Sequence, residues 1–245
     1  MTPSPCTRFL RPDDLDALIR LERRQWSEQQ AADEEALRQR IDNHAGLCVG
    51  AFCPATGEAL ASLFMKPVDL KDIRNASSWA DCSAPGRDSA LAAPSRLFGI
   101  SLTSVDPRAA ASVFEFFWPY ALKQGYREIY LGSPIPGLRR ALADDPTLGV
   151  EDYVYSRREQ WPRDAQLRYY YQKGFREIVA VLPNYFPHPQ SLDYGVLLRG
   201  KVPLSRLGLL WKVMPFGLLQ WVLGWIAGID KKVPSRPAVR GGAGT

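Results

Sequence analysis

The stretch LFGISLTSVDPRAAASVFEFFWPYALKQGYREIYL, residues 97–131, decides the fold class. Its apolar residues predict strands at 97–104 and 128–131 and a helix from about residue 109 to residue 124. Gly125 is the expected C-cap of that helix. A strand, a helix and a strand with short joins form a right-handed crossover with parallel strands. The sequence therefore predicts a mixed α/β fold.

The flanking sequence predicts further strands and helices around this unit. Pro12 and the two acids after it begin a helix, since proline suits the first turn and acids favour the positive end of the helix dipole. Residues 68–96 break the pattern as a long loop, and long loops in compact domains are often functional. The other expected elements are strands at 7–11, 47–52, 59–65, 176–182 and 193–198, and helices at 32–43, 138–143, 150–160 and 166–173.

The composition excludes several classes of protein. The 245 residues are 46% hydrophobic and 23% charged, which excludes a disordered chain, a collagen and a polytopic membrane protein. The length allows one large domain or two small ones. The four cysteines form no CxxC motif and no zinc spacing with histidine, so we expect no metal site and reduced thiols in a cytoplasmic body.

The charge is unevenly distributed along the chain. The net charge is +5, and residues 201–245 hold seven Lys or Arg and one acid, Asp230, which gives this segment +6 and leaves residues 1–200 at −1. A nucleic-acid-binding protein carries its basic excess on the folded body, so no nucleic acid is expected as a partner. Here the basic residues flank an apolar segment, which favours contact with an anionic membrane surface.

The residues Leu167-Arg-Tyr-Tyr-Tyr-Gln-Lys-Gly-Phe175 carry a resemblance to a known superfamily. A tyrosine, three residues and Gly-Phe resemble the late helix of the GNAT superfamily of acyl-CoA-dependent N-acyltransferases, with Tyr170 at the tyrosine. The match is closer to the GNAT branch found fused to nitrilase-like hydrolases. It covers roughly residues 7–200 and implies a mixed central sheet flanked by helices. The further matching motifs are Trp79 in the long loop, Phe98-Gly99, Ile135-Pro136-Gly137, Asp152-Tyr153-Val154, Leu182-Pro-Asn-Tyr185 and Ser191-Leu-Asp-Tyr-Gly195.

The resemblance implies direct transfer, in which an amine attacks the thioester carbonyl of an acyl-CoA held between the central strands. A helix N-terminus would hold the pyrophosphate through its backbone N–H groups. The superfamily pattern there is Arg or Gln, two residues, Gly, one residue, then Gly or Ala. This chain has Arg108 at the first position but Ala111 and Val113 at the small-residue positions. Either the helix binds the donor or it begins without a ligand. The expected donor-binding residues are Arg108, Ala109, Ala110, Ala111 and Ser112.

Tyr170 is the expected general acid. A phenol with a pKa of about 10 is protonated at neutral pH and can give its proton to the leaving thiolate. The alternative is that three adjacent tyrosines only pack and hydrogen-bond. The general base stays open, because the related branch has a carboxylate where this chain has Ser101. We expect Ser101 to bind substrate together with Ser133. Ser133 begins a Pro-Gly segment at the carboxyl end of a parallel strand, which either shapes the acceptor pocket or is a rigid turn.

Residues 207–229 form an apolar segment interrupted by Lys212 and Gln220. Its uninterrupted run, 213–229, reaches only the short limit for crossing a bilayer, and Pro215 is expected to kink it. Basic residues flank both ends, which favours a monotopic or re-entrant anchor. The alternative is a helix that covers the sheet or lines an acyl tunnel. The face expected to meet the membrane holds Trp211, Met214, Leu218, Val222, Trp225 and Ile229, and Gly224 and Gly228 form a small-residue packing face.

Together these features predict a GNAT-like α/β domain at 1–200, an apolar membrane-associating helix at 201–230 and a basic disordered tail at 231–245. We expect an enzyme that transfers an acyl group from acetyl-CoA or a longer acyl-CoA to an amine on a small molecule or peptide, without a metal. Its expected location is cytoplasmic, peripheral or monotopic at the inner membrane face. The alternative is a catalytically silent module that binds a lipid, an acyl carrier or a protein partner.

Overall fold

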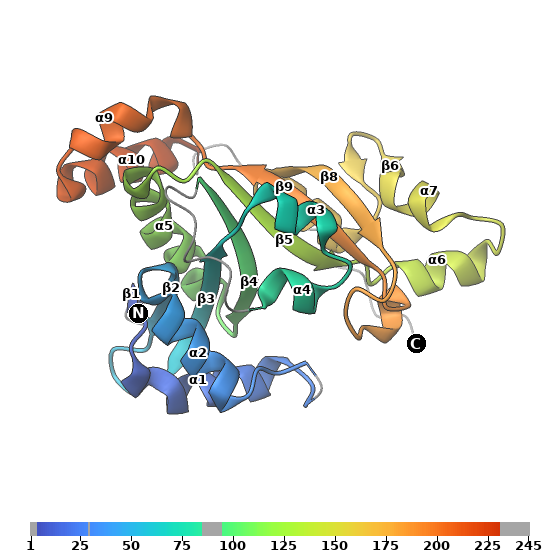
Figure 1. Ribbon diagram of the computed structural model, residues 1–245, viewed down its shortest axis with the longest axis horizontal. Coiled ribbons are helices and arrows are strands. Elements are labelled where there is room, and N and C mark those ends of the chain that lie inside the picture. Colours follow the sequence, from blue (N-terminus) through green and yellow to red (C-terminus); the bar gives the residue numbers. More distant parts are fainter. Residues whose placement is uncertain (1–3, 29, 85–94, 231–245) are drawn as a thin grey trace, which may run out of the picture.

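The computed structural model describes residues 4–28, 30–84 and 95–230, with side chains described through residue 224. Its centre is a seven-stranded sheet in the order β1-β2-β3-β4-β5-β9-β8 (Figure 1). Only β4 and β5 pair in parallel, and the other neighbours are antiparallel. The strands are β1 (Cys6–Phe9), β2 (Cys48–Phe52), β3 (Ala59–Pro67), β4 (Arg96–Ser104), β5 (Glu128–Pro134), β8 (Phe175–Leu182) and β9 (Gly195–Lys201).

The parallel pair confirms the predicted crossover, since α5 (Pro107–Gln124) connects β4 to β5. Gly125 ends α5 in the left-handed conformation, at φ 85°, as its sequence position predicts. Strand β5 continues three residues beyond the predicted end because it pairs with β9 through Pro134. The local apolar pattern therefore located the β4-α5-β5 crossover, and pairing with β9 set the length of β5.

Helices cover both faces of the sheet. One face packs on α1 (Leu15–Gln25), α2 (Glu34–Asn43), α3 (Leu70–Asn75) and α4 (Trp79–Ser83), around buried Phe64 and Phe98. On the other face, α5 covers the half formed by β2 to β4, and α8 (Ala165–Gln172) packs on β5 and β8. Shorter elements complete the chain: α6 (Leu138–Asp144), α7 (Val150–Tyr155) and the 3-10 turns Pro12–Asp14, Ala45–Leu47, Pro189–Ser191 and Ser205–Leu207.

Two stretches differ from the sequence prediction. The predicted long loop contains α3 and α4, whose first turns are capped by the side chains of Asp69 and Ser78. The helix predicted over 150–160 ends at Tyr155. A small hairpin follows, β6 (Arg157–Arg158) with β7 (Trp161–Pro162), and it turns through Glu159 at φ 58°. Short capped helices and a two-residue hairpin give too few apolar repeats for periodicity to detect them.

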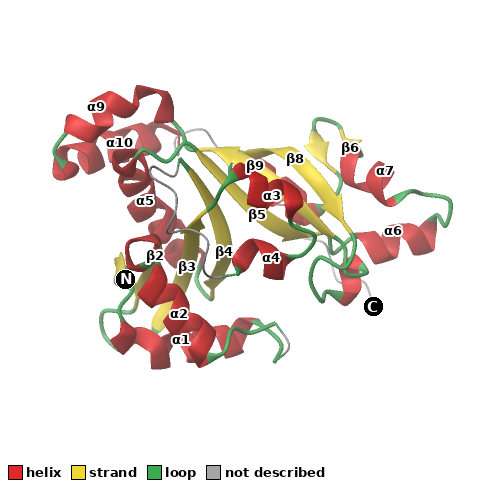
Figure 2. Ribbon diagram, viewed as in Figure 1, coloured by secondary structure: helices red, strands yellow, loops and turns green. Residues whose placement is uncertain are grey.

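The C-terminal apolar segment is two helices rather than one kinked helix. They are α9 (Gly208–Val213) and α10 (Phe216–Asp230), separated at Met214 and Pro215. Both pack against α5, as Figure 2 shows at the end of the molecule away from α6 and α7. Lys123 of α5 donates hydrogen bonds to the carbonyls of Lys212 (3.2 Å) and Met214 (2.9 Å) at the end of α9. The C-terminal helices are thus tied to the body by polar as well as apolar contacts.

The packing corrects part of the predicted membrane face. Trp211 is buried in the cluster of apolar residues around α5, together with Leu219 and Leu223, whereas Leu218 is exposed. No described atom lies within 4 Å of a Cβ built on Gly224, so among the described residues this glycine has no packing partner. The side chains of Trp225, Gly228 and Ile229 and the predicted tail 231–245 lie outside the described residues. No helix in the described part of the chain is both long and apolar enough to cross a membrane.

Candidate active site

The central feature of the site is the point where β4 and β5 stop pairing. Their parallel register runs from Arg96–Glu128 to Gly99–Leu131, and both strands continue beyond it. At this point β4 also carries a bulge against β3, since Met65 pairs with Gly99 while Phe64 pairs with Ser101 and leaves Ile100 as the extra residue. Ligands of open α/β sheets bind at such carboxyl ends of parallel strands.

Ser101 and Ser133, the two predicted substrate-binding serines, each lie two residues beyond the last pair of β4 and β5. The Ser101 hydroxyl is buried, and the described part of the chain offers it no hydrogen-bond partner. Ser133 is fully buried, and its hydroxyl donates to the carbonyl of Pro134 (2.9 Å). A buried hydroxyl without a partner is unfavourable. Ser101 is therefore the serine whose hydroxyl still has a hydrogen bond to offer a ligand.

The N-terminus of α5 begins just after β4 and is already capped. The Asp106 carboxylate accepts a hydrogen bond from the backbone N–H of Arg108 (2.7 Å) and forms an ion pair with the Arg108 side chain (3.1 Å). The backbone N–H of Ala110 donates to the Asp106 carbonyl. The hydrogen bonds from Arg108 lower the pKa of Asp106, which keeps it charged at neutral pH. A negative charge therefore already occupies the end of the helix where a phosphate would bind.

The other predicted donor-binding residues pack against the body of the protein or form hydrogen bonds within it. Ala109 is fully buried, as is Val113, which fills the position of the superfamily's second small residue with a core side chain. The Ser112 hydroxyl accepts from Thr7 (2.9 Å) and donates to the Ala109 carbonyl (2.8 Å). Ala110 and Ala111 are half-buried on the first turns of α5. The side chains of this helix start thus serve the packing of α5, which leaves only its backbone and Arg108 for a ligand.

Tyr170 lies on α8, half-buried against the cluster that contains Ile135 and Leu198. Its ring makes edge contacts with Tyr169 and Phe175, at centroid distances of 5.4 and 6.0 Å. Burial raises the pKa of the Tyr170 phenol, and a hydrogen bond from Gln166 offsets this only in part. The phenol is therefore protonated at neutral pH, as a proton donor must be.

Asp164, which the sequence analysis did not single out, fixes the start of α8. It is buried, and its Oδ1 accepts from the backbone N–H groups of Gln166 (2.8 Å) and Leu167 (3.2 Å). Its Oδ2 accepts from the Gly137 N–H (3.0 Å) and the Tyr153 hydroxyl (2.8 Å). One carboxylate thus joins α8, α7 and the turn after β5. The sequence signal was an acid at the N-cap position of the predicted helix.

Two glycines permit close contacts in this region. A Cβ on Gly137 would lie 2.2 Å from the Tyr153 hydroxyl, so no other residue fits beside Asp164. A Cβ on Gly132 of β5 would lie 2.3 Å from the ring of Tyr185, which is buried over the sheet. The matching Ile-Pro-Gly and Leu-Pro-Asn-Tyr motifs therefore have packing roles next to the parting strands.

A cavity of about 280 Å³ lies between α2, α4 and the bulge of β4. Trp79 forms part of its wall and donates its indole N–H to the carbonyl of Ile100 (3.1 Å). Among the described residues, the lining contains two basic side chains and no carboxylate. The lining residues are Ala36, Gln39, Arg40, Asn43, His44, Trp79, Ala80, Ser83, Ala84 and Ile100.

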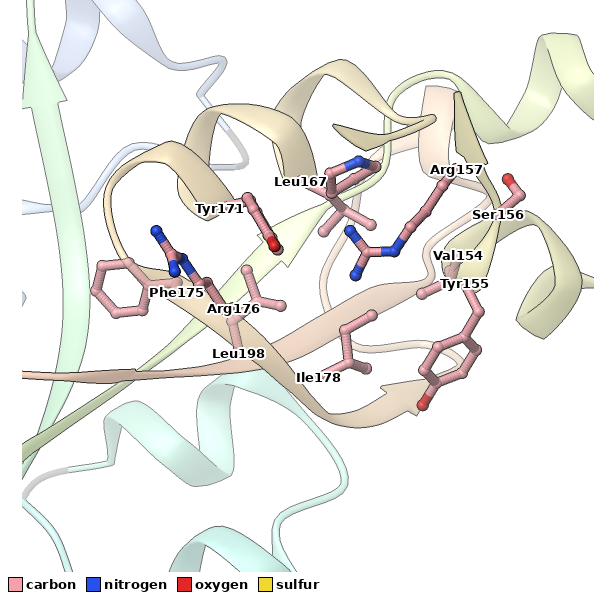
Figure 3. Close-up of a pocket in the computed structure, with 11 residues that line it drawn as sticks. Val154, Tyr155, Ser156, Arg157, Leu167, Tyr171, Phe175, Arg176, Ile178 and Leu198 are labelled. Atoms are coloured by element: carbon pink, nitrogen blue, oxygen red, sulfur yellow. The ribbon is translucent and has the colours of Figure 1, made fainter. Parts of the chain in front are cut away.

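A smaller cavity, about 90 Å³, lies under the C-terminal half of α8. Figure 3 shows Arg157 and Arg176 on either side of the Tyr171 ring, with Leu167 beside the ring and Ile178 and Leu198 beneath. The two guanidinium carbons lie 5.1 and 5.3 Å from the ring centroid. Both arginines are exposed, and no residue of β4 lines this cavity. We therefore place the candidate active site at the bulge and the parting strands instead.

His188, a possible general base by residue type, has structural partners. His188 caps a 3-10 turn, and its Nδ1 lies 2.8 Å from the buried Ser191 hydroxyl. Ser191 in turn accepts from the Ile135 N–H (2.9 Å). Burial lowers the pKa of His188. No group of three or more metal-binding side chains is present in residues 4–28, 30–84 and 95–230.

Comparison with known proteins identifies the fold. No protein-family model matches the sequence, and no curated protein matches it. The GphF GNAT-like decarboxylase in complex with isobutyryl-CoA aligns with a TM-score of 0.65 at 20% identity, over 80% of this chain and 99% of that one. The loading GNATL domain of CurA from Lyngbya majuscula aligns with a TM-score of 0.67 at 17% identity, over 82% and 98%. The chain thus has the GNAT fold, with its mixed sheet flanked by helices.

Proposed function

We propose that this protein transfers an acyl group from an acyl-CoA to an amine by direct attack at the parting of β4 and β5. The observation that supports this most is the arrangement around that point: two strands that stop pairing at Gly99–Leu131, and the unpaired buried hydroxyl of Ser101. A solved structure with the same fold is a complex with isobutyryl-CoA, which supports an acyl-thioester as the donor. The nitrilase-associated branch is proposed from the sequence motifs alone.

In the proposed reaction the amine nitrogen attacks the thioester carbonyl, and the carbon–sulfur bond then breaks. Tyr170 gives its phenolic proton to the leaving thiolate, and Asp164 holds the helix that carries it. The amine proton passes to water, and the tyrosine is then reprotonated from solvent. Ser101 donates its hydroxyl hydrogen to the thioester oxygen, where charge develops in the transition state. The products are an amide and free CoA.

The proposed donor site is the N-terminus of α5, with Arg108 and the backbone of residues 109–112 around the pyrophosphate. Asp106 must then give up its cap, or share it, when the anion binds. This weakens CoA binding relative to a helix start with glycines and without an acid. The silent-module alternative remains the second candidate, and Asp106 is the feature that favours it.

We also propose that α9 and α10 rest on an anionic membrane surface. The two helices and the turn Ser205–Leu207 before them carry six exposed large apolar residues and the exposed cations Arg206 and Lys212, and exposed Lys201 ends the preceding strand β9. Such a combination suits an interfacial position rather than a spanning one. Co-sedimentation with phosphatidylserine vesicles tests this: Leu209→Glu with Val213→Glu should release the protein, and equal binding by the variant removes the proposal. The six apolar residues are Leu207, Leu209, Leu210, Val213, Leu218 and Trp221.

The test of acyl transfer is a thiol-release assay with acetyl-, octanoyl-, palmitoyl- and malonyl-CoA against a library of amines. Amine-dependent release of CoA with formation of the amide supports the proposal. Release of CO₂ from malonyl-CoA without amide formation would instead favour decarboxylation, the activity for which GphF is named. CoA binding without turnover of any donor supports the silent module.

A further inference from the structure

The cavity between α2 and α4 contains a half-buried cation, Arg40, which forms no ion pair with any described residue. The Arg40 guanidinium lies between two aromatic rings, with its central carbon 5.6 Å from the Phe64 centroid and 5.8 Å from the Trp79 centroid. Among the described residues no carboxylate or carbonyl lies within ion-pair or hydrogen-bond distance of its nitrogens. The guanidinium therefore keeps its donors for something that enters the cavity.

The two neighbouring carboxylates, Glu22 and Asp33, accept hydrogen bonds from residues other than Arg40. Glu22 Oε1 accepts from the Thr103 hydroxyl, and its Oε2 accepts from the Ala32 N–H (3.2 Å). Asp33 caps α2 through the Ala36 N–H (2.8 Å). Burial lowers the pKa of Arg40, and Glu22 and Asp33 offset this only in part, by long-range Coulombic attraction without direct contact. A partly desolvated charge that forms no ion pair gains stability when an anionic ligand pairs with it.

We propose that this cavity binds a carboxylate group of the substrate and holds it on Arg40. A planar guanidinium matches a carboxylate with two parallel hydrogen bonds, and the aromatic rings keep its plane fixed. Gln39, Asn43 and Ser83 supply further polar atoms, and the described lining residues include no carboxylate, which favours an anion. The cavity reaches Ile100, the bulge residue next to the proposed reaction point.

The inference deepens the proposed acyl transfer and rests on it for the reaction itself. The carboxylate has two sources: an amine acceptor that is also a carboxylate, such as an amino acid, or an acyl chain that ends in one. Both present the same group to Arg40. They differ in whether the carboxylate arrives with the acceptor or with the CoA.

Calorimetric titration with matched ligand pairs tests the proposal and separates the two sources. The acceptor pair is 4-aminobutyrate against butylamine, and the donor pair is succinyl-CoA against butyryl-CoA. In one of these pairs the carboxylate member should bind about tenfold tighter or more, because a charge-assisted hydrogen-bonded pair replaces contact with water. Arg40→Gln should abolish the difference. Arg38→Gln, an exposed arginine on the same helix that pairs with Glu34, should leave it unchanged.

A second variant keeps the test decisive if Arg40→Gln does not fold. Asn43→Asp places a carboxylate in the lining one helical turn from Arg40. Arg40 should then pair with this carboxylate and keep its contacts with the two rings. The protein should lose its preference for the carboxylate ligand. Equal affinity within both pairs, or a preference that survives both substitutions, overturns the proposal. If carboxylates bind through Arg40 but no CoA compound binds, acyl transfer fails and the cavity assignment stands. If acyl transfer proceeds but neither carboxylate ligand is preferred, the cavity assignment fails and acyl transfer stands.

Discussion

Substitution of Asp164 by alanine should destabilise the protein more than any other single polar change at the site. The buried carboxylate accepts four hydrogen bonds from three segments. Loss of its N-cap function on α8 costs about 1 kcal/mol. The Gly137 N–H and the buried Tyr153 hydroxyl then lose their acceptor, at about 1–3 kcal/mol each. The free energy of unfolding should therefore fall by about 3–5 kcal/mol, since water satisfies part of the lost bonds.

Urea denaturation followed by circular dichroism measures this change. The matched control is Asp145→Ala, which removes an exposed carboxylate that accepts from the Thr147 N–H (3.0 Å) and hydroxyl (2.7 Å). We expect the control to cost about 1 kcal/mol or less. Tyr153→Phe removes one of the four bonds and should cost about 1 kcal/mol. If Asp164→Ala is no more destabilising than Asp145→Ala, Asp164 does not fix α8 and the positioning of Tyr170 needs another explanation.

Three further predictions concern other parts of the molecule. Leu219→Ala should lower the free energy of unfolding by about 2–5 kcal/mol and its exposed neighbour Leu218→Ala by about 0.5 kcal/mol or less; equal effects in urea denaturation would show that α10 does not pack as described. Asp106→Asn keeps an N-cap side chain but removes the negative charge, so calorimetry should find tighter CoA binding than in wild type, and unchanged or weaker binding argues against a donor site there. Burial raises the pKa of Asp14, but hydrogen bonds from the Arg8 side chain and the Arg11 backbone N–H outweigh burial and lower it. The stability that Asp14 contributes is therefore present above pH about 4 and lost as pH falls through its folded pKa, a loss that Asp14→Asn should reduce and that an unchanged pH profile would contradict.

The sequence predicted the crossover and most of the strands because their signals are local. Apolar runs, a proline at a helix start and a glycine at a helix end each act within a few residues. The C-terminal segment shows the limit of such signals. Its helical wheel placed Trp211 and Leu218 on one outward face, yet Pro215 splits the segment and α5 buries Trp211. Which apolar side faces inward depends on a partner distant in sequence, and no local pattern encodes it.

The sequence motifs of the candidate site could be predicted, but the residues that contact them in the fold could not. The Tyr-x-x-x-Gly-Phe spacing located α8 correctly, whereas the role of Asp164 depends on Gly137 and Tyr153, which the fold brings to it. The departure at Val113 has a physical reason in the structure, because the side chain is part of the core beneath α5. Arg40 could not be singled out, since its position between two aromatic rings follows only from the packing of α2 and α4 on the sheet.

The central claim is that Tyr170 protonates the leaving thiolate in acyl transfer from CoA. Its most direct test is the single-turnover rate of CoA release at saturating acyl-CoA and amine, in wild type and in Tyr170→Phe. Tyr169→Phe and Tyr171→Phe control for packing on the same helix. A general acid contributes mainly to the transition state, so the account predicts a rate about a hundred- to ten-thousand-fold lower in Tyr170→Phe, with unchanged donor affinity. Full wild-type turnover in Tyr170→Phe, with the chemical step rate-limiting, would contradict it.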